Sequence, residues 1–357
     1  MARALLAAIL AAALPAAGGP AGAAASAPLV VGLLLPPDER EAASIRHGAQ
    51  AAVEEVSEAG GGVVRIAERG KRGAWGSDAS EAALLVMDDG AVGLIAPTGG
   101  AASHLVLQVS GRTALPVVSL CPDASVTRAS IPWMVRVAPS TLDEARAIFG
   151  GVPATRWLAF VPTGRAGREA SSDLAAAAAA ERSGRRSIMQ AVAGEDGAIS
   201  DAAVRKALSS AGPEAVLLWL PPAAAGRLAR SLRTAGFKGP IAGPSRLASG
   251  AFAAEAGPFA DGVVVPGIDP EAGSGSFGSR YRRLFGTDPD PAAALAHDAV
   301  LLLVRAVRRS ESSVSTASFV TGEPLRGATG LLVFDRHGDR LVQLPLWRYR
   351  SGHLARL

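Results

Sequence analysis

The stretch PLVVGLLLP at residues 28–36, followed by REAASIRHGAQAAVEEVSEAGGG at residues 40–62, decides the fold of this chain. The first segment is a continuous apolar run with the length of a strand, and the second carries apolar residues at the helical period. A second pair follows, with VVRIAE at 63–68, a helix-length stretch up to Met87, and VGLIAPTGG at 92–100. Strands this apolar must be covered on both faces, so the pattern predicts a parallel sheet with helices on both sides.

The same alternation of strand and helix patterns continues through most of the chain. Strands are predicted at 29–35, 63–67, 92–96, 116–120, 134–138, 156–162, 187–194, 214–222, 239–245 and 262–267. Helices are predicted at 39–59, 78–88, 99–111, 167–182, 199–211, 222–236, 248–256 and 292–309. Near the end, GLLVFDRHGDRLVQLPLWRY at 330–349 predicts a hairpin whose turn is DRHGD. The chain is therefore expected to have an α/β fold.

The composition is typical of a large globular protein without a nucleic-acid surface. A chain of 357 residues corresponds to about two domains. Hydrophobic residues make up 49% and aromatic residues 4%, so the core must be built mainly from Ala, Val and Leu. Lys and Arg number 36 against 32 Asp and Glu, and the basic residues are scattered instead of forming a run or stripe. Nucleic acid is therefore not an expected partner.

Residues 1–25 have the pattern of a cleavable secretion signal. Arg3 supplies the positive start, the run from Ala4 to Leu14 is apolar, and small residues follow, with cleavage expected near Ala23 or Ala25. The apolar run is shorter than the about 20 residues that span a bilayer. An uncleaved anchor and a disordered alanine-rich tail are the alternatives. The pattern predicts a periplasmic or secreted protein.

The sequence contains one cysteine, Cys121. A single cysteine excludes an internal disulfide, even in the oxidising compartment that the signal implies. Cys121 also lies far from the signal, so it cannot carry an N-terminal lipid anchor. A nucleophilic cysteine needs a basic partner, and the sequence shows none nearby, so Cys121 is interpreted as a small apolar filler.

The segment GSGSFG at 273–278 matches the G-x-G-x-x-G pattern of dinucleotide sites, with Asp298 twenty residues after Gly278. The context does not fit, because the segment is not the first strand-to-helix turn and Asp298 lies inside a predicted helix. A flexible loop is predicted instead. The five histidines show no metal-ligand spacing, and no catalytic motif is present. No cofactor, metal or catalytic residue is therefore expected.

Five further segments carry a resemblance to a known family. They are LPVVSLCPDASVT at 115–127, PWMVRVAPSTLDEARAI at 132–148, LRTAGFKGPIAGPS at 232–245, HDAVLLLVRAV at 297–307 and LRGATGLLVFDRHGD at 325–339. With the opening segments, their order and spacing resemble a type I periplasmic substrate-binding protein of ABC importers, the branch typified by branched-chain amino-acid receptors. The resemblance covers nearly the whole mature chain.

The resemblance implies two doubly wound parallel-sheet lobes joined by a three-segment hinge. One lobe would be 28–138 plus 267–330, and the other 139–266 plus 331–357. Such a protein is a receptor without enzymatic activity that captures a small polar or anionic solute, such as an amino acid, amide or organic acid, by hinge closure. Its partners would be the solute and an ABC permease in the inner membrane, and a monomer is expected.

Two other functions are compatible with this sequence. Penicillin-binding-protein activators of the outer membrane are similar in the LLLP opening and the GATG ending. By that similarity, the chain could be an envelope regulatory protein that reuses the fold to bind a protein partner. Most of those regulators are lipoproteins, and the anchoring cysteine is missing here. An envelope enzyme is the third alternative.

The first candidate binding residues are Thr98, Gly99 and Gly100, between a predicted strand and a predicted helix. Glycines let a ligand approach the backbone, and free N–H groups at a helix start favour an anion. The resemblance implies that this turn binds the α-carboxylate of the ligand. The alternative is a tight turn with no binding role.

Ser119, Cys121 and Asp123 lie on the matching turn after the next strand. The resemblance implies that this turn offers backbone groups and a hydroxyl to the ligand. Asp123 departs from the usual small hydroxyl residue, and an alternative is that it caps the short helix that follows.

The predicted second lobe departs further from the family pattern. Arg165 and Ala166 stand where the resemblance implies an aromatic residue, and Pro221 lies in a turn that lacks the usual tyrosine. Ser245 and Arg246 stand where an acidic residue would meet an amino group. These changes argue against an ordinary α-amino acid, and arginines bind carboxylates and phosphates in a bidentate manner. An anionic ligand is therefore one hypothesis, and solvated loop arginines are the alternative.

Overall fold

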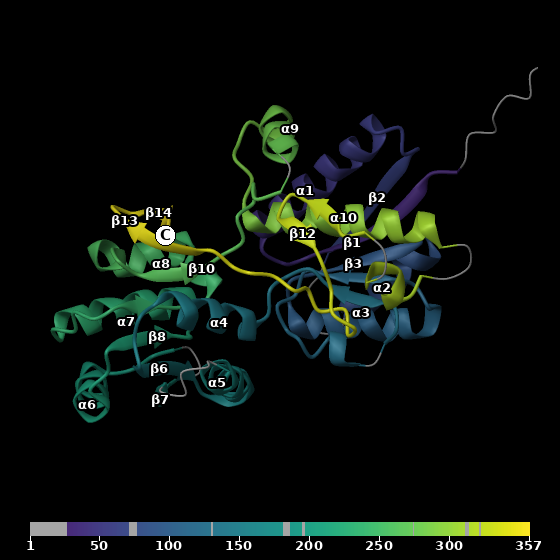
Figure 1. Ribbon diagram of the computed structural model, residues 1–357. Helices are drawn as coiled ribbons and strands as arrows, with labels where there is room; N and C mark the ends of the chain where they lie inside the picture. Colours follow the sequence, from purple (N-terminus) through teal and green to yellow (C-terminus); the bar gives the residue numbers. More distant parts are fainter. Residues whose placement is uncertain are drawn as a thin grey trace, which may run out of the picture.

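The computed structural model describes residues 27–70, 77–129, 131–180, 186–194, 197–273, 275–310, 314–320 and 323–357. Two α/β lobes lie side by side in Figure 1, one built on the N-terminal strands and the other on the middle of the chain. This architecture confirms the predicted α/β fold with two doubly wound, mainly parallel sheets. The predicted signal peptide lies outside the described residues.

The first sheet has five strands among the described residues, in the order β2-β1-β3-β4-β5, and all neighbours are parallel. Its strands are β1 (Leu29–Leu35), β2 (Val64–Gly70), β3 (Gly93–Ala96), β4 (Val117–Ser119) and β5 (Met134–Arg136). The intervening helices are α1 (Glu39–Glu58), α2 (Ser77–Met87), α3 (Gly100–Thr113) and the short 3-10 helix η1 (Thr127–Ala129). Helix α1 packs on one face, and α2 and α3 pack on the other.

The second sheet has seven strands among the described residues, in the order β14-β13-β10-β9-β8-β6-β7. Its strands are β6 (Arg156–Pro162), β7 (Ser187–Ala193), β8 (Ala215–Leu218), β9 (Ile241–Ala242), β10 (Val264–Pro266), β13 (Leu346–Arg350) and β14 (His353–Arg356). One face is covered by α4 (Thr141–Gly151) and α5 (Gly164–Ala179). The other face is covered by α6 (Asp201–Ala211), α7 (Pro222–Thr234) and α8 (Gly250–Ala256). The short helices η2 (Ser245–Leu247) and η3 (Gly257–Ala260) flank α8.

In its described part, the chain passes between the two lobes three times: after β5, after β10 and before β13. After β10 it forms α9 (Gly275–Phe285), α10 (Pro291–Arg309), α11 (Thr316–Val320), β11 (Leu325–Gly327) and β12 (Gly330–Leu332). Helices α9 and α10 pack against α1, so they belong with the first sheet. The residue boundaries of the lobes given above stay a prediction.

Two local predictions are wrong. The segment 273–278, predicted as a loop, begins α9 at Gly275, because Phe277 is fully buried against Tyr281 and anchors the first helical turn. The predicted hairpin around DRHGD reduces to one antiparallel bridge, between Phe334 and Arg340. The hairpin that joins the second sheet is formed by β13 and β14 instead.

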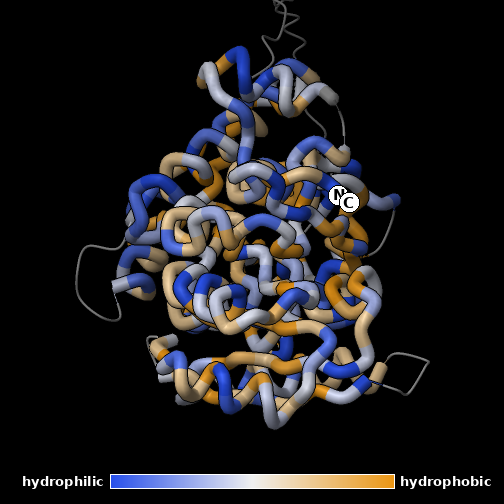
Figure 2. The backbone as a smooth tube through the Cα atoms, turned by 90° about the vertical axis from the view of Figure 1, so that its left-hand side faces the viewer, coloured by the Kyte–Doolittle hydropathy of each residue, from blue (hydrophilic) through white to orange (hydrophobic). Residues whose placement is uncertain are grey.

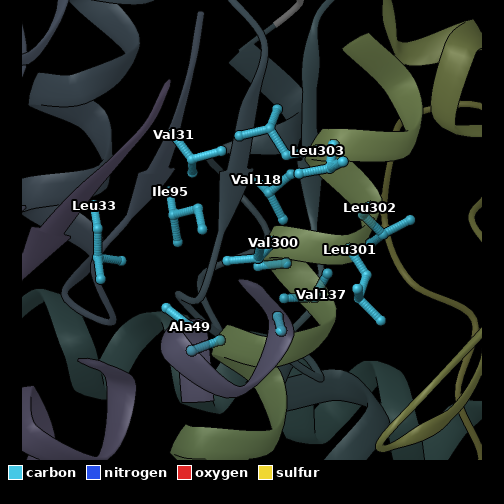
Figure 3. Packing of buried hydrophobic residues seen from close by; sticks show 14 of the residues in the cluster. Val31, Leu33, Ala49, Ile95, Val118, Val137, Val300, Leu301, Leu302 and Leu303 are labelled. Carbon is cyan, nitrogen blue, oxygen red and sulfur yellow. The ribbon is translucent and has the colours of Figure 1, made fainter. Parts of the chain in front are cut away.

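The contact between α1 and α10 forms the centre of the first lobe. Side chains of α10, among them Val300 and Leu303, lie against Val31 and Val118 of the sheet (Figure 3). Figure 2 shows the hydrophobic segments mainly in the interior and the hydrophilic ones mainly at the outside. Gly48 lets the two helices approach closely, since a Cβ atom there would lie 2.0 Å from the Ala293 carbonyl oxygen.

A buried ion pair joins β5 to the segment that precedes β13. Arg136 is 1% exposed, and its Nε and Nη2 atoms donate to Oδ1 of Asp339 at 3.0 and 2.7 Å. The Arg136 backbone N–H also donates to the Gly338 carbonyl. Arg340, 2% exposed, donates from Nη2 to the Thr329 carbonyl at 3.0 Å. These contacts fix the first and third connections between the lobes to each other.

A second buried network surrounds His297 in α10. Its Nδ1 lies 3.2 Å from Oδ1 of Asp298, and its Nε2 lies 3.3 Å from Oε2 of Glu55. Burial by itself lowers the pKa of His297, but the hydrogen bonds with Asp298 and Glu55 outweigh it and raise the pKa above 6.5. Asp298 also accepts the Ala328 N–H at 2.6 Å, so the network ties α10 to the turn between β11 and β12.

We expect Gly48→Ala to destabilise the protein, by about 1 to 3 kcal/mol, because the added methyl group meets backbone and not a movable side chain. Gly150→Ala is the matched control, since a Cβ atom at Gly150 meets nothing within 4 Å in α4. Urea unfolding measures both variants. A Gly48→Ala protein as stable as Gly150→Ala would contradict this account of the helix contact.

We expect His297→Gln to cost more stability near pH 6 than near pH 9. Because the pKa of His297 is raised on folding, the charged form contributes stability that is complete below 6.5 and is lost as the pH rises through the folded value. The difference between the two pH values should be about 1.5 to 3 kcal/mol, as for hydrogen bonds to charged groups. Urea unfolding at both pH values measures it, and an equal cost at both would show that His297 is neutral in the folded protein.

Candidate functional site

The carboxyl ends of the strands in the two sheets carry most of the predicted binding residues. In Figure 1, α4 and α5 lie on the side of the second lobe nearest the first. Burial raises the pKa of Asp173 in α5, while Arg128 of η1 lowers it and Asp123 raises it. Asp173 is thus within electrostatic reach of residues that follow β4. Parallel sheets bind ligands at these strand ends, so the region between them is the candidate site.

On the first sheet, the Thr98–Gly100 turn lies between β3 and α3, as predicted. Gly99 is the N-cap of α3 and, as a glycine, makes no side-chain capping hydrogen bond. Burial raises the pKa of Glu41 in α1, and an interaction with the nearby Thr98 side chain lowers it. Thr98 therefore faces a carboxylate, which sequence reasoning did not anticipate.

The next turn buries two of its three predicted residues. Ser119 is fully buried, and its Oγ lies 3.2 Å from Oγ of Ser103 and accepts the Cys121 N–H at 3.1 Å. Cys121 is 1% exposed. Asp123 alone of the three reaches the surface, with its side chain 34% exposed. Its Oδ1 accepts the Ser125 N–H at 2.8 Å, so it caps the turn before η1.

The Asp123 carboxylate also lies against the first turn of α3. A Cβ atom on Gly100 would be 2.9 Å from Oδ2 of Asp123. The same Oδ2 lies 3.9 Å from Nε2 of His104. A protein carboxylate therefore stands beside the helix N-terminus at which the sequence predicts the carboxylate of a solute.

On the second sheet, Ser245 is held by a buried glutamate. Glu144, in the first turn of α4, is 7% exposed and accepts hydrogen bonds from both the backbone N–H and the hydroxyl of Ser245. Burial raises the pKa of Glu144, whereas Ser245 and Arg246 lower it. Sequence patterns did not predict Glu144 as part of this site, because Glu144 precedes Ser245 by 101 residues.

Arg246 lies beside the end of β8. Its Nε donates to the Leu220 carbonyl at 3.3 Å, and its guanidinium stands 5.8 Å from the centre of the Trp219 ring. Among the described residues its Nη1 and Nη2 atoms have no hydrogen-bond partner. Desolvation lowers the pKa of this guanidinium although the side chain is open to solvent. Pro221, the N-cap of α7, adjoins Leu220, so Pro221, Ser245 and Arg246 belong to neighbouring turns.

Arg165 and Ala166 lie in the first turn of α5. Their side chains lie outside what the structure describes, so the pairing of Arg165 with Arg246 stays a prediction. In the described part of the chain, no three His, Cys, Asp or Glu side chains group as a metal site requires. None of the described helices combines the length and apolar character of a membrane span.

The chain belongs to a family of periplasmic binding proteins, whose family model, described as "Periplasmic binding protein", matches residues 37–333. This family is a class of solute-binding proteins. No curated protein matches the sequence.

Several solved structures share the fold. A leucine-binding protein from Thermotoga maritima is 19% identical, with a TM-score of 0.76 over 92% of this chain and 97% of that chain. A putative branched-chain amino-acid ABC transporter protein from Rhodospirillum rubrum is 22% identical, with a TM-score of 0.74 over 92% and 100%. A solute-binding protein from R. palustris, solved in complex with benzoate, is 17% identical, with a TM-score of 0.70 over 92% and 95%. These likenesses confirm the type I periplasmic-binding-protein fold that the sequence resembles.

We expect the Cys121 thiol to react slowly in the folded protein. Burial raises the pKa of Cys121 to about 11, so the thiol keeps its proton at neutral pH. Because the thiolate is the reactive form, labelling by a disulfide reagent near pH 8 should be about a hundredfold slower in buffer than in denaturant. Labelling at equal rates would show an accessible thiolate and would reopen the nucleophile hypothesis.

Proposed function

We propose that this protein is an exported solute-binding receptor of an ABC importer. It captures a small polar or anionic solute between the carboxyl ends of its two sheets. The observation that carries the proposal is the placement of two sets of polar turns, around Thr98 and Asp123 on one sheet and around Ser245 and Arg246 on the other, on lobes joined by three connections. Such an arrangement suits a solute that is enclosed when the lobes close.

Relatives of the same fold support a small organic solute. One is a leucine-binding protein, one from Streptococcus pneumoniae was solved in complex with isoleucine, and one from R. palustris was solved in complex with benzoate. The two ligands seen in those complexes each carry a carboxylate. The sequence changes at Ser245 and Arg246 favour an organic acid or amide over an ordinary α-amino acid.

The chemistry of the site favours binding over catalysis. Cys121 is buried and keeps its proton, and the Ser119 hydroxyl is fully buried among polar partners. Glu144 is occupied in holding Ser245. These groups shape the turns, and none of them is placed as an activated nucleophile.

Hinge closure would couple capture to delivery. A solute that contacts both lobes binds the closed form better than the open form, and this difference in affinity is what shifts the lobes. The closed form then presents both lobes to the permease. Capture followed by release suits a micromolar dissociation constant, which is about −8 kcal/mol.

A thermal-shift screen of the mature protein against amino acids, amides, dicarboxylates and aromatic acids tests the proposal. A solute present at about a hundredfold its dissociation constant stabilises the folded state by about 2.7 kcal/mol, which raises Tm by about 2 to 4 °C or more for a protein of this size. Calorimetry should then give one site per chain. If no solute in the panel raises Tm, the receptor function is wrong and a regulator that binds a protein becomes the better account.

A further inference from the structure

We propose that the solute binds with its anionic end at the second sheet, on Arg246, and with a cationic or hydrogen-bond-donating end at the first sheet, near Asp123. This inference rests on the proposed function. It reverses the orientation that the family resemblance implies for the Thr98–Gly100 turn. The expected solute class is a dipolar compound with a carboxylate or similar anion at one end and an ammonium, amide or hydroxyl group at the other.

The first sheet presents negative charge where an anion was expected. A helix N-terminus attracts an anion through its free N–H groups, but the Asp123 carboxylate already lies beside the first turn of α3, against Gly100. A solute carboxylate there would face a like charge at close range, which disfavours binding. The Asp123 carboxylate therefore takes the place beside the start of α3 that a solute anion would otherwise occupy.

Thr98, in the turn before α3, also lies near a carboxylate. Thr98 lies near Glu41, whose pKa is raised by burial and raised further by Asp38 and Asp290. Arg128 of η1 interacts electrostatically with Asp173 of the other lobe, and the titratable group beside Asp123 is His104, whose Nε2 lies 3.9 Å from Oδ2 of Asp123. The surface that the first sheet offers to a solute therefore accepts hydrogen bonds and favours positive charge.

The second sheet presents the opposite charge. Arg246 is oriented by stacking near Trp219 and by one hydrogen bond from Nε to the Leu220 carbonyl. Its two Nη groups have no partner among the described residues, and Arg246 is an exposed residue, although desolvation lowers the pKa of its guanidinium. A guanidinium held on one side with two donors free on the other suits bidentate binding of a carboxylate.

The neighbouring acid does not neutralise Arg246 by direct contact. Glu144 lies near enough to raise the pKa of Arg246, but its carboxylate accepts the two hydrogen bonds from Ser245. In the part of the chain that the structure describes, no ion pair joins Glu144 to Arg246. The free Nη groups therefore remain available to a solute anion.

Matched straight-chain probes test this orientation by calorimetry. We would use 5-aminopentanoate, pentanoate and glutarate, together with leucine, isoleucine and benzoate, on the wild-type protein and on the Arg246→Gln and Asp123→Asn variants. Arg246→Gln should weaken every carboxylate that binds by about tenfold or more. Asp123→Asn should weaken 5-aminopentanoate, leave pentanoate unchanged and strengthen glutarate, because it removes a like charge.

Two further variants control for general charge and for folding. Arg227→Gln removes an exposed arginine of α7 that pairs with Glu255, and it should leave all affinities unchanged. Arg246→Lys keeps the positive charge but loses the planar guanidinium with its paired N–H donors. This variant should therefore bind carboxylates with an affinity between those of the wild type and Arg246→Gln. Equal Tm values for the unliganded proteins show that each variant is folded.

Contrary results separate the two proposals. Two outcomes would show that the inferred orientation is wrong: the probes bind and Arg246→Gln leaves their affinity unchanged, or Asp123→Asn strengthens the binding of pentanoate. The carboxylate then lies on the first sheet, and the receptor function stands. If neither these probes nor any solute of the thermal-shift panel binds the wild-type protein, the receptor function fails and this inference fails with it.

Discussion

The buried ion pair between Arg136 and Asp339 is the contact on which the geometry of the molecule depends. Arg136 ends β5, just before the first connection between the lobes, and Asp339 precedes the third. A guanidinium that is 1% exposed cannot lose its partner without leaving an uncompensated charge in the interior. Arg340 adds hydrogen bonds to the Thr329 and Val137 carbonyls. The two connections are therefore held together at the first lobe, an arrangement that suits rotation of the second lobe about them.

In our proposal, that constraint lets the strand ends of the two sheets act together. Each sheet alone exposes a row of turns that could hold only one side of a small molecule. Asp123 of the first lobe and Asp173 of the second lie within electrostatic reach of each other, and in our proposal the turns carrying Thr98 and Arg246 are the two sides of one site. The charge on these sides is unequal, with carboxylates on the first sheet and an unpaired guanidinium on the second, and this difference is what sets the orientation of a solute in our account.

The fold was predictable from the sequence because its strands are apolar along their length and its helices are strongly periodic. β1, α1 and α10 form close to where the pattern places them. The structure at the end of the chain was not predictable from the sequence. Arg340 is buried against backbone carbonyls of the first lobe, and this contact replaces the strand pairing that the DRHGD turn predicted. Because parallel sheets bind ligands at the carboxyl ends of their strands, the sequence located the turns of the site. It did not identify the residues that contact those turns. Contacts such as that of Ser245 with Glu144 join residues distant in the chain, and only packing determines them.

Lobe closure on a solute is the central claim, and the distance between the lobes measures it directly. Spin labels at Gln108 of α3 and Arg168 of α5, both exposed, would be placed in a Cys121→Ala background and read by pulsed dipolar spectroscopy. We predict that the solute with the largest thermal shift shortens this distance and narrows its distribution. An unchanged distance at saturating solute would contradict the account, because binding would then not draw the two lobes together.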